Sequence, residues 1–291
     1  QSRLFFGLLR KFDATKWIDL AVEKMSKNDQ PFFTSKERKK YNIKSKMIGQ
    51  YIVDILGPNF QTQKHVIYFH GGMYTIGANI SHKQWMIKLL KKADCKVTYV
   101  DYPLAPEHTF LETIQMAVDA YKLLSAEFPD DHFILMGDSA GGGLALVLAQ
   151  FLRDHKANHQ PIGLILYSPW VRLDMENPHI QAMNAKDLLL DVDTLKHAAK
   201  SYAGDEDLSH PYLSPFYGSC EDLGQMDVFF GSDELLTPDI ALLEKKCQAE
   251  GTNAAFHCFE GMQHVFNLFT FLPESQDVFQ KTIALINQET G

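Results

Sequence analysis

The sequence is poor in cysteine and contains no long apolar run. Its four cysteines form no C-x-x-C pair, so the pattern indicates free thiols in a reducing compartment rather than a disulfide framework. Cys258 falls in a predicted strand and is expected to be a buried structural thiol. No apolar run reaches the roughly 20 residues of a membrane span, and the opening residues lack both the apolar core and the cleavage site of a signal peptide. We therefore expect a cytoplasmic protein without stable membrane insertion.

Basic residues are also fewer than acidic residues. The 291 residues include 28 Lys and Arg against 36 Asp and Glu, which gives a formal net charge of −8. This balance argues against nucleic acid or an anionic membrane surface as the main partner. A hydrophobic content of 45% and a charged content of 22% are typical of a globular protein. The length suits one large α/β domain with a subsidiary cap.

Short apolar runs alternate with longer helical patterns along most of the chain. Strands are predicted at 47–56, 65–69, 97–100, 133–136, 163–167, 228–230 and 254–259, and helices at 81–93, 109–128, 144–152 and from about 275 onward. This alternation predicts a mostly parallel sheet with helices on both faces. Active-site groups then belong on loops at the carboxyl ends of the strands.

One stretch joins a predicted strand to a predicted helix through a single tight turn. Gly137-Asp138-Ser139-Ala140-Gly141 fits the pattern G-x-S-x-G, with an apolar run before it and a helix-forming segment after it. In this context the pattern predicts a sharp elbow that exposes the Ser139 hydroxyl at the end of the sheet. The N–H groups at the start of the following helix face a developing oxyanion. Ser139 is therefore the predicted nucleophile.

A serine nucleophile needs an imidazole base, and the imidazole needs a carboxylate to orient it. In α/β-hydrolases these follow in the chain order Ser, Asp or Glu, His. Asp233 and His264 each lie just past a predicted strand and are the predicted acid and base. Glu234 is the chief alternative for the acid, and His210 is the chief competitor of His264.

The loop after the predicted strand 65–69 is expected to complete the site. Gly71 and Gly72 lie there, at a position whose backbone N–H groups contribute to the oxyanion hole of this fold, together with the N–H of Ala140. Large side chains on loops near the nucleophile are candidates for a compact apolar pocket, with packing of the cap as the alternative. These are Met73, Tyr74, Trp170, Phe216 and Tyr217.

Five motifs in this order resemble the hormone-sensitive-lipase-like family of α/β-hydrolase carboxylesterases, over roughly residues 64 to 268. They are His70-Gly-Gly-Met73, Asp101-Tyr-Pro-Leu-Ala-Pro-Glu107, Gly137-Asp-Ser-Ala-Gly-Gly142, Gly231-Ser-Asp-Glu-Leu235 and His264-Val-Phe266. Two positions depart from the family pattern. Met73 replaces its third glycine, which bears on substrate size, and Pro103 replaces its arginine, which removes a salt bridge that braces the loop.

The resemblance implies an α/β-hydrolase fold with a helical cap. The expected division is 1–45 as the N-terminal part of the cap, 46–172 and 213–291 as the core, and 173–212 as the cap insertion. The implied activity is that of a serine carboxylesterase that hydrolyses small, short-acyl-chain esters through an acyl-enzyme intermediate. No metal or cofactor is implied.

Other activities use the same groups. An amidase, an arylformamidase or a sugar-ester deacetylase shares the triad and the oxyanion hole, and a ligand-binding relative without catalysis is a further alternative. A small-molecule ester is the expected partner, and nucleic acid is not. Val278, Phe279 and Ile283 on the last predicted helix are expected to form its core face, although they also suit a dimer contact. The prediction therefore leaves monomer and homodimer open.

Overall fold

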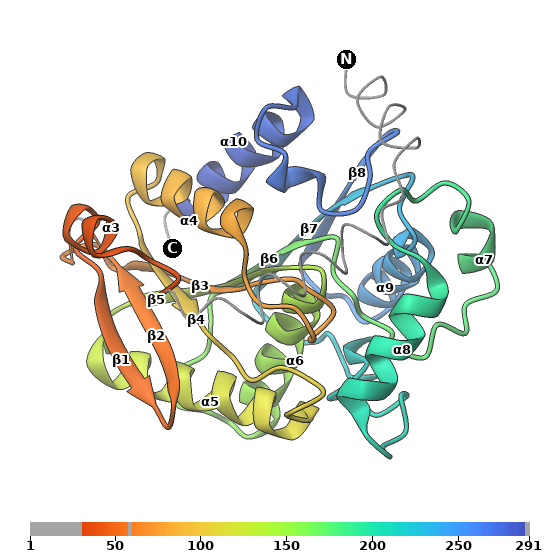
Figure 1. Ribbon diagram of the computed structural model, residues 1–291, viewed down its shortest axis with the longest axis horizontal. Coiled ribbons are helices and arrows are strands. Elements are labelled where there is room, and N and C mark those ends of the chain that lie inside the picture. The colour runs from red at the N-terminus through yellow and green to blue at the C-terminus, as the bar shows by residue number, and fades with distance from the viewer. Residues whose placement is uncertain (1–30, 58–59, 289–291) are drawn as a thin grey trace.

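The structure, a computed structural model, describes residues 31–57 and 60–288. They are built around an eight-stranded sheet with the order β1-β2-β4-β3-β5-β6-β7-β8 (Figure 1). β2 pairs antiparallel with both β1 and β4, and every other pairing is parallel. The strands are β1 (Lys44–Ile48), β2 (Tyr51–Leu56), β3 (Lys64–Phe69), β4 (Lys96–Val100), β5 (His132–Asp138), β6 (Gly163–Tyr167), β7 (Gln225–Gly231) and β8 (Ala254–Phe259). The predicted α/β class with a mostly parallel sheet is confirmed.

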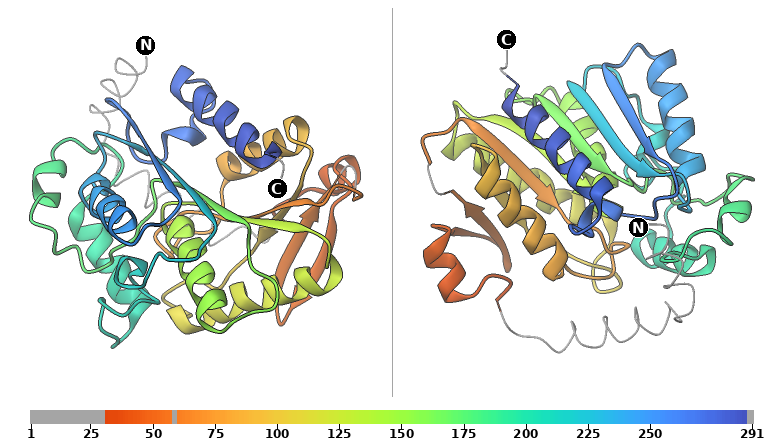
Figure 2. Two further views of the ribbon diagram at one scale, coloured as in Figure 1. Left: turned by 180° about the vertical axis from the view of Figure 1, so that it is seen from behind. Right: turned by 90° about the horizontal axis from the view of Figure 1, so that it is seen from above.

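Helices cover both faces of the sheet (Figure 2). One apolar cluster packs α4 and α10 against one face, and the other packs α5, α6 and α9 against the opposite face. Because both faces are covered, β4 and β6 are buried along their whole length. The helices are α3 (Ser35–Lys40), α4 (Ile80–Lys92), α5 (Phe110–Glu127), α6 (Ala140–Asp154), α7 (Ile180–Met183), α8 (Val192–Ala203), α9 (Thr237–Ala249) and α10 (Pro273–Asn287), with short 3₁₀ turns η1 (Pro215–Tyr217) and η2 (Phe266–Leu268).

The predicted single strand over 47–56 is wrong. The chain reverses at Gly49, whose φ is +58°, and forms the hairpin of β1 and β2 with Ile48 paired to Tyr51. A two-residue turn of this kind needs left-handed backbone, which glycine adopts without strain. Only Gly49 and Gln50 separate the apolar residues of the two strands, and so short an interruption was read as part of one strand.

The last helix does pack through its predicted core face. Val278 and Phe279 are buried on α10, and Ile283 is partly buried against the same cluster. Phe279 contacts Trp85 of α4 edge to face, with ring centroids 5.3 Å apart. These apolar side chains are therefore occupied within the chain.

The segment 173–212 interrupts the alternation of strands and helices, as expected. It contains α7 and α8 but no strand, and it lies beside α9 at one end of the sheet (Figure 1). The described residues 31–45 form α3 and the start of β1 at the other end. Residues 1–30, which carry most of the predicted N-terminal part of the cap, lie outside the described residues.

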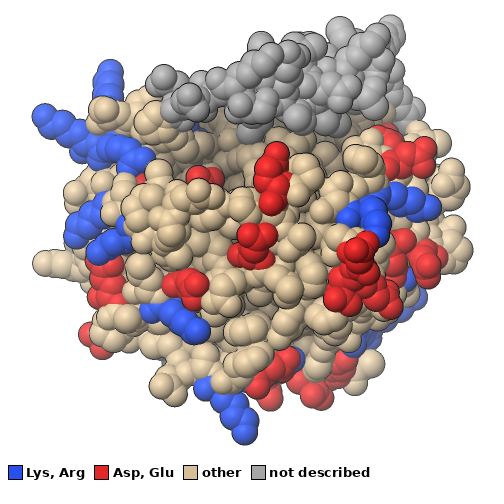
Figure 3. All heavy atoms as spheres, turned by 60° about the horizontal axis from the view of Figure 1, so that its bottom comes forward, with Lys and Arg blue, Asp and Glu red and all other residues tan. Residues whose placement is uncertain are grey.

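The four cysteines are free thiols, and three of them are buried. Cys258 is exposed on β8, so the expectation of a buried thiol there is wrong: β8 is an edge strand of the described sheet, and none of its residues is fully buried. Figure 3 shows one face of the molecule, where acidic and basic side chains are interspersed and neither sign covers the surface.

Within the described part of the chain, every helix falls short of the length and apolarity that crossing a bilayer requires.

Candidate active site

Ser139 lies on a tight elbow between β5 and α6. Its φ of 53° and ψ of −121° are unusual for a residue with a side chain. The turn brings backbones so close that a Cβ on Gly141 would lie 2.1 Å from the carbonyl oxygen of Phe69. Only glycine fits there, which explains the last position of the G-x-S-x-G pattern. The elbow predicted from the sequence is therefore present.

His264 reaches the Ser139 hydroxyl from the loop between β8 and η2. Its Nε2 lies 2.9 Å from Ser139 Oγ, and both residues are about 5% exposed or less. The next residue, Val265, has left-handed backbone with a φ of 47°, and its N–H donates to the hydroxyl of Ser168 at 3.1 Å. This anchor holds the loop that presents the imidazole. The predicted nucleophile and base thus come together.

The carboxylate against His264 is Glu234 rather than Asp233. Glu234 Oε2 lies 3.0 Å from His264 Nδ1, and the Glu234 side chain is fully buried. Asp233 is half-buried and instead accepts a hydrogen bond from the Ser232 hydroxyl at 3.2 Å. The backbone N–H of Asp233 donates to the Met262 carbonyl, which ties this turn to the loop that carries His264. The expectation that Asp233 contacts His264 is corrected, and the alternative, Glu234, occupies that position.

Burial and the paired charges set the proton affinities of this pair. Burial alone would lower the pKa of His264, but the hydrogen bond and charge of Glu234, with the charges of Asp187 and Asp138, outweigh it, so the pKa lies above its usual value of 6.5. Burial raises the pKa of Glu234, and the bond to His264 offsets only part of that rise. Its second oxygen, Oε1, has no hydrogen-bond partner among the described residues. Since Nδ1–H donates to Glu234, Nε2 is free to accept the Ser139 proton.

Three backbone N–H groups near the nucleophile have no acceptor within the described residues. They belong to Gly71, Gly72 and Ala140, the predicted oxyanion-hole residues. The loop approaches the elbow so closely that a Cβ on Gly71 would lie 2.3 Å from a carboxylate oxygen of Asp138. Gly72 adopts a φ of +128°, a region that favours glycine. Unpaired N–H groups at such a loop can receive an oxyanion.

Asp138, the residue before Ser139, fixes the elbow through its side-chain hydrogen bonds. The sequence motif did not predict this role. Asp138 is buried, and it accepts hydrogen bonds from Tyr68 at 2.5 Å and from His82 Nε2 at 3.2 Å. His82 Nδ1 accepts the Asn79 N–H at the start of α4, so Nε2 carries the proton. Burial would raise the pKa of Asp138, but its interactions with His82 and Tyr68 outweigh burial and lower the pKa.

Three of the five predicted pocket residues are buried. Met73 and Tyr74 follow Gly72 with left-handed φ values of 55° and 61°, so Met73 holds a conformation that the glycine usual at its position adopts more easily. The Tyr74 ring stacks on Tyr202 of α8, with centroids 3.8 Å apart, and lies 6.1 Å from the Trp170 ring. Tyr74 and Trp170 therefore pack the loop against the insertion.

The other two predicted pocket residues lie on η1. Phe216 is half-buried and Tyr217 is 39% exposed. The Arg172 guanidinium lies over both rings and donates to the Tyr217 hydroxyl at 2.9 Å. His210, the competitor of His264, accepts the Tyr212 N–H within its own turn and packs against Phe110. It makes no hydrogen bond to Ser139.

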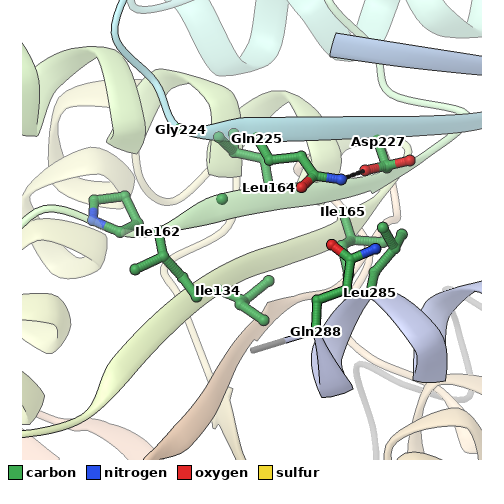
Figure 4. Close-up of a pocket in the computed structure, with 11 residues that line it drawn as sticks. Ile134, Ile162, Leu164, Ile165, Gly224, Gln225, Asp227, Leu285 and Gln288 are labelled. Atoms are coloured by element: carbon green, nitrogen blue, oxygen red, sulfur yellow. Dashed lines mark hydrogen bonds between the residues drawn. The ribbon is translucent and has the colours of Figure 1, made fainter. Parts of the chain in front are cut away.

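A cavity of about 350 Å³ lies elsewhere, at the amino ends of β5, β6 and β7 beside the end of α10 (Figure 4). Its main polar groups are already paired: Asp227 accepts from Gln225 at 2.9 Å and bonds His257 at 2.8 Å. None of the Ser139, His264 and Glu234 side chains lines it. Over the described ranges 31–57 and 60–288, no three His, Cys, Asp or Glu side chains gather as a metal site would require.

The parallel sheet, the strand-to-helix elbow and the loop of free N–H groups define an α/β hydrolase. The chain belongs to the α/β-hydrolase fold family, whose profile matches residues 66–268. It is 31% identical to an acetyl-hydrolase of Streptomyces hygroscopicus over 84% of this chain and 82% of that protein. It is also 31% identical to an esterase of Acinetobacter venetianus, over 72% of this chain and 70% of that protein.

Solved structures agree with this assignment. A hormone-sensitive lipase from a metagenome library superposes with a TM-score of 0.82 at 25% identity, over 98% of each chain. The structure of EstE5 soaked with p-nitrophenyl butyrate superposes with a TM-score of 0.78 at 25% identity, over 94% of this chain and 97% of that one. The resemblance to the hormone-sensitive-lipase-like family is confirmed.

Proposed function

We propose that this protein is a serine carboxylesterase that hydrolyses small, uncharged, short-acyl esters through an acyl-enzyme intermediate. The observation that carries the proposal is the line of two hydrogen bonds from Ser139 Oγ through His264 to Glu234. Relatives named acetyl-hydrolase and esterase support ester hydrolysis as the reaction. The name of the first relative also favours short acyl groups.

The reaction follows from the protonation states at the site. His264 Nε2 takes the proton of Ser139 as Oγ attacks the ester carbonyl, and Glu234 stabilises the imidazolium that forms. The N–H groups of Gly71, Gly72 and Ala140 hold the oxyanion. His264 then protonates the leaving alcohol, and a water activated by the same imidazole hydrolyses the acyl-enzyme.

The preference for short acyl chains rests on how the loop after the oxyanion glycines is filled. Met73 stands at the position of the third glycine of the family pattern, and Met73, Tyr74 and Trp170 are all buried. Bulky side chains at these positions leave little volume next to the nucleophile. We expect activity on p-nitrophenyl esters to peak at acetate or butyrate and to fall for chains of eight carbons or more.

The test is a substrate panel on the purified protein with Ser139→Ala as the control. The panel holds p-nitrophenyl esters of increasing length, acetylated sugars and aryl amides, which represent the amidase, arylformamidase and deacetylase alternatives. We expect the short esters to turn over and Ser139→Ala to lose about 10³-fold or more in kcat. An active Ser139→Ala variant would disprove the assignment. If amides or sugar acetates turn over faster than the short esters, the proposed mechanism stands and the proposed substrate class is wrong.

The cytoplasmic location and the choice between monomer and homodimer stay predictions from the sequence. Light scattering on the purified protein measures the oligomeric state directly.

A further inference from the structure

A short segment of the insertion, residues 186–190, runs past both loops that carry the base and its acid. Asp187 lies at its centre and is 7% exposed. One carboxylate oxygen accepts the N–H groups of Leu189 and Leu190 at 2.8 and 3.0 Å. The other accepts the N–H of Leu235, the residue after Glu234, at 2.7 Å. Asp187 thus ties the insertion to the loop that carries the acid.

The same segment is tied to the loop that carries the base. Gln263 precedes His264, and its side-chain oxygen accepts the Leu188 N–H at 2.8 Å. The Gln263 amide nitrogen donates to the Lys186 carbonyl at 3.3 Å. The loops that carry Glu234 and His264 therefore both bond to the segment 186–190.

The hydrogen bonds of Asp187 are those that an ionised carboxylate accepts. All three of its partners are N–H donors, and a carboxylate accepts such bonds while a protonated carboxyl must also donate one. Burial raises the pKa of Asp187 above its usual value, and the charge of His264 and the three N–H bonds offset only part of that rise. Among the described residues, the carboxylates whose negative charge acts on His264 are Glu234 from the β7–α9 loop, which bonds it directly, Asp187 from the insertion and Asp138 from the elbow.

We propose that Asp187 is a positioning residue of the hydrolytic site, which acts on the reaction through His264 and Glu234. It ties the loop of Glu234 to the segment that Gln263 ties to the loop of His264. It also adds its negative charge to that of Glu234, so that the imidazolium formed during the reaction is stabilised further. This role rests on the proposed function. The insertion then contributes a residue that supports the catalytic groups.

Two substitutions separate the effect of the Asp187 charge from the effect of the hydrogen bonds that join the insertion to the catalytic loops. Asp187→Asn removes the charge and places an amide N–H₂ against backbone N–H donors. Gln263→Ala removes the neighbouring tether and leaves every charge in place. Asp191→Asn is the matched control, because Asp191 lies in the same insertion and caps α8 through the Thr194 N–H at 2.8 Å, and asparagine retains that cap.

The measurement is kcat and kcat/KM for p-nitrophenyl acetate between pH 5 and 9. Loss of a negative charge disfavours the imidazolium, so in Asp187→Asn the acidic limb of kcat/KM should move to lower pH by about half a unit or more. Its kcat should fall by about 10-fold or more because the loops loosen. Gln263→Ala should lower kcat without moving the acidic limb, and Asp191→Asn should match the wild type in both.

An acidic limb that stays in place in Asp187→Asn, or that moves equally in Asp191→Asn, would overturn the proposal. If Asp187→Asn does not fold, Asp187→Ser removes the same charge with a smaller side chain and is judged by the same shift. A wild-type protein that hydrolyses no ester refutes the proposed function instead. The pH–rate profile of the wild type, measured first, therefore distinguishes failure of the proposed function from failure of the Asp187 proposal.

Discussion

Replacing Glu234 with Gln tests which carboxylate orients His264, because the site geometry indicates Glu234 and the sequence pattern predicted Asp233. Glu234→Gln preserves the shape of the side chain but removes the charge that faces His264 Nδ1 at 3.0 Å. The reaction places a positive charge on the imidazole, and two unit charges about 4 Å apart at an effective dielectric of about 20 attract by about 4 kcal/mol. That energy alone corresponds to about a 10³-fold lower rate.

The amide adds a second penalty. An amide can also donate to Nδ1, which favours the tautomer whose Nε2 carries a proton and cannot accept one from Ser139. Replacing the acid of a triad with its amide costs about 10⁴-fold in kcat in a serine protease. We therefore expect Glu234→Gln to lose between about 10³-fold and 10⁴-fold in kcat for p-nitrophenyl acetate, and its acidic limb to move to lower pH.

Asp233→Asn is the control for this experiment. Asp233 is half-buried, and within the described chain its side chain bonds the neighbouring Ser232 hydroxyl and not His264, so its neutral isostere should stay within about twofold of the wild type. Circular dichroism and thermal melting establish that both variants fold. A severe loss in Asp233→Asn beside a nearly active Glu234→Gln would refute the reasoning and restore the acid predicted from the sequence.

Three further outcomes are expected. The wild-type acidic limb of kcat/KM should have its midpoint above pH 6.5, because the raised pKa of His264 keeps the imidazole protonated at higher pH than usual; a midpoint below 6 would contradict this. Gly71→Ala should reduce kcat by about 10²-fold, since its Cβ would lie 2.3 Å from the anchored Asp138 carboxylate and displace an oxyanion donor; steady-state kinetics with unchanged activity would count against that loop. Tyr202→Ala should lower the free energy of unfolding by about 3 kcal/mol or more, because it empties a buried stacking site, whereas Tyr202→Phe should cost about 1 kcal/mol; urea denaturation that shows equal losses would mean that the hydroxyl, not the ring, carries the contact.

Much of the fold and part of the site followed from the sequence because their constraints are local. A strand, a five-residue turn and a helix in direct succession leave one conformation for Ser139, and the glycine beside it is required by the backbone that passes 2.1 Å from its Cβ position. His264 was identified because the order of motifs along the chain leaves a single histidine at the end of the next strand. The alternation of apolar runs likewise predicted the parallel sheet.

The tertiary structure alone decided which carboxylate faces the imidazole and what supports it. Asp233 and Glu234 are neighbours in one turn that a backbone hydrogen bond ties to Met262, near the base, and only the folded chain shows that the second of them bonds the imidazole. Asp187 and Tyr202 come from an insertion whose helical pattern says nothing about which loops it meets. Side-chain direction in a turn and contact between distant segments depend on packing of the whole chain, because no local pattern encodes the partner.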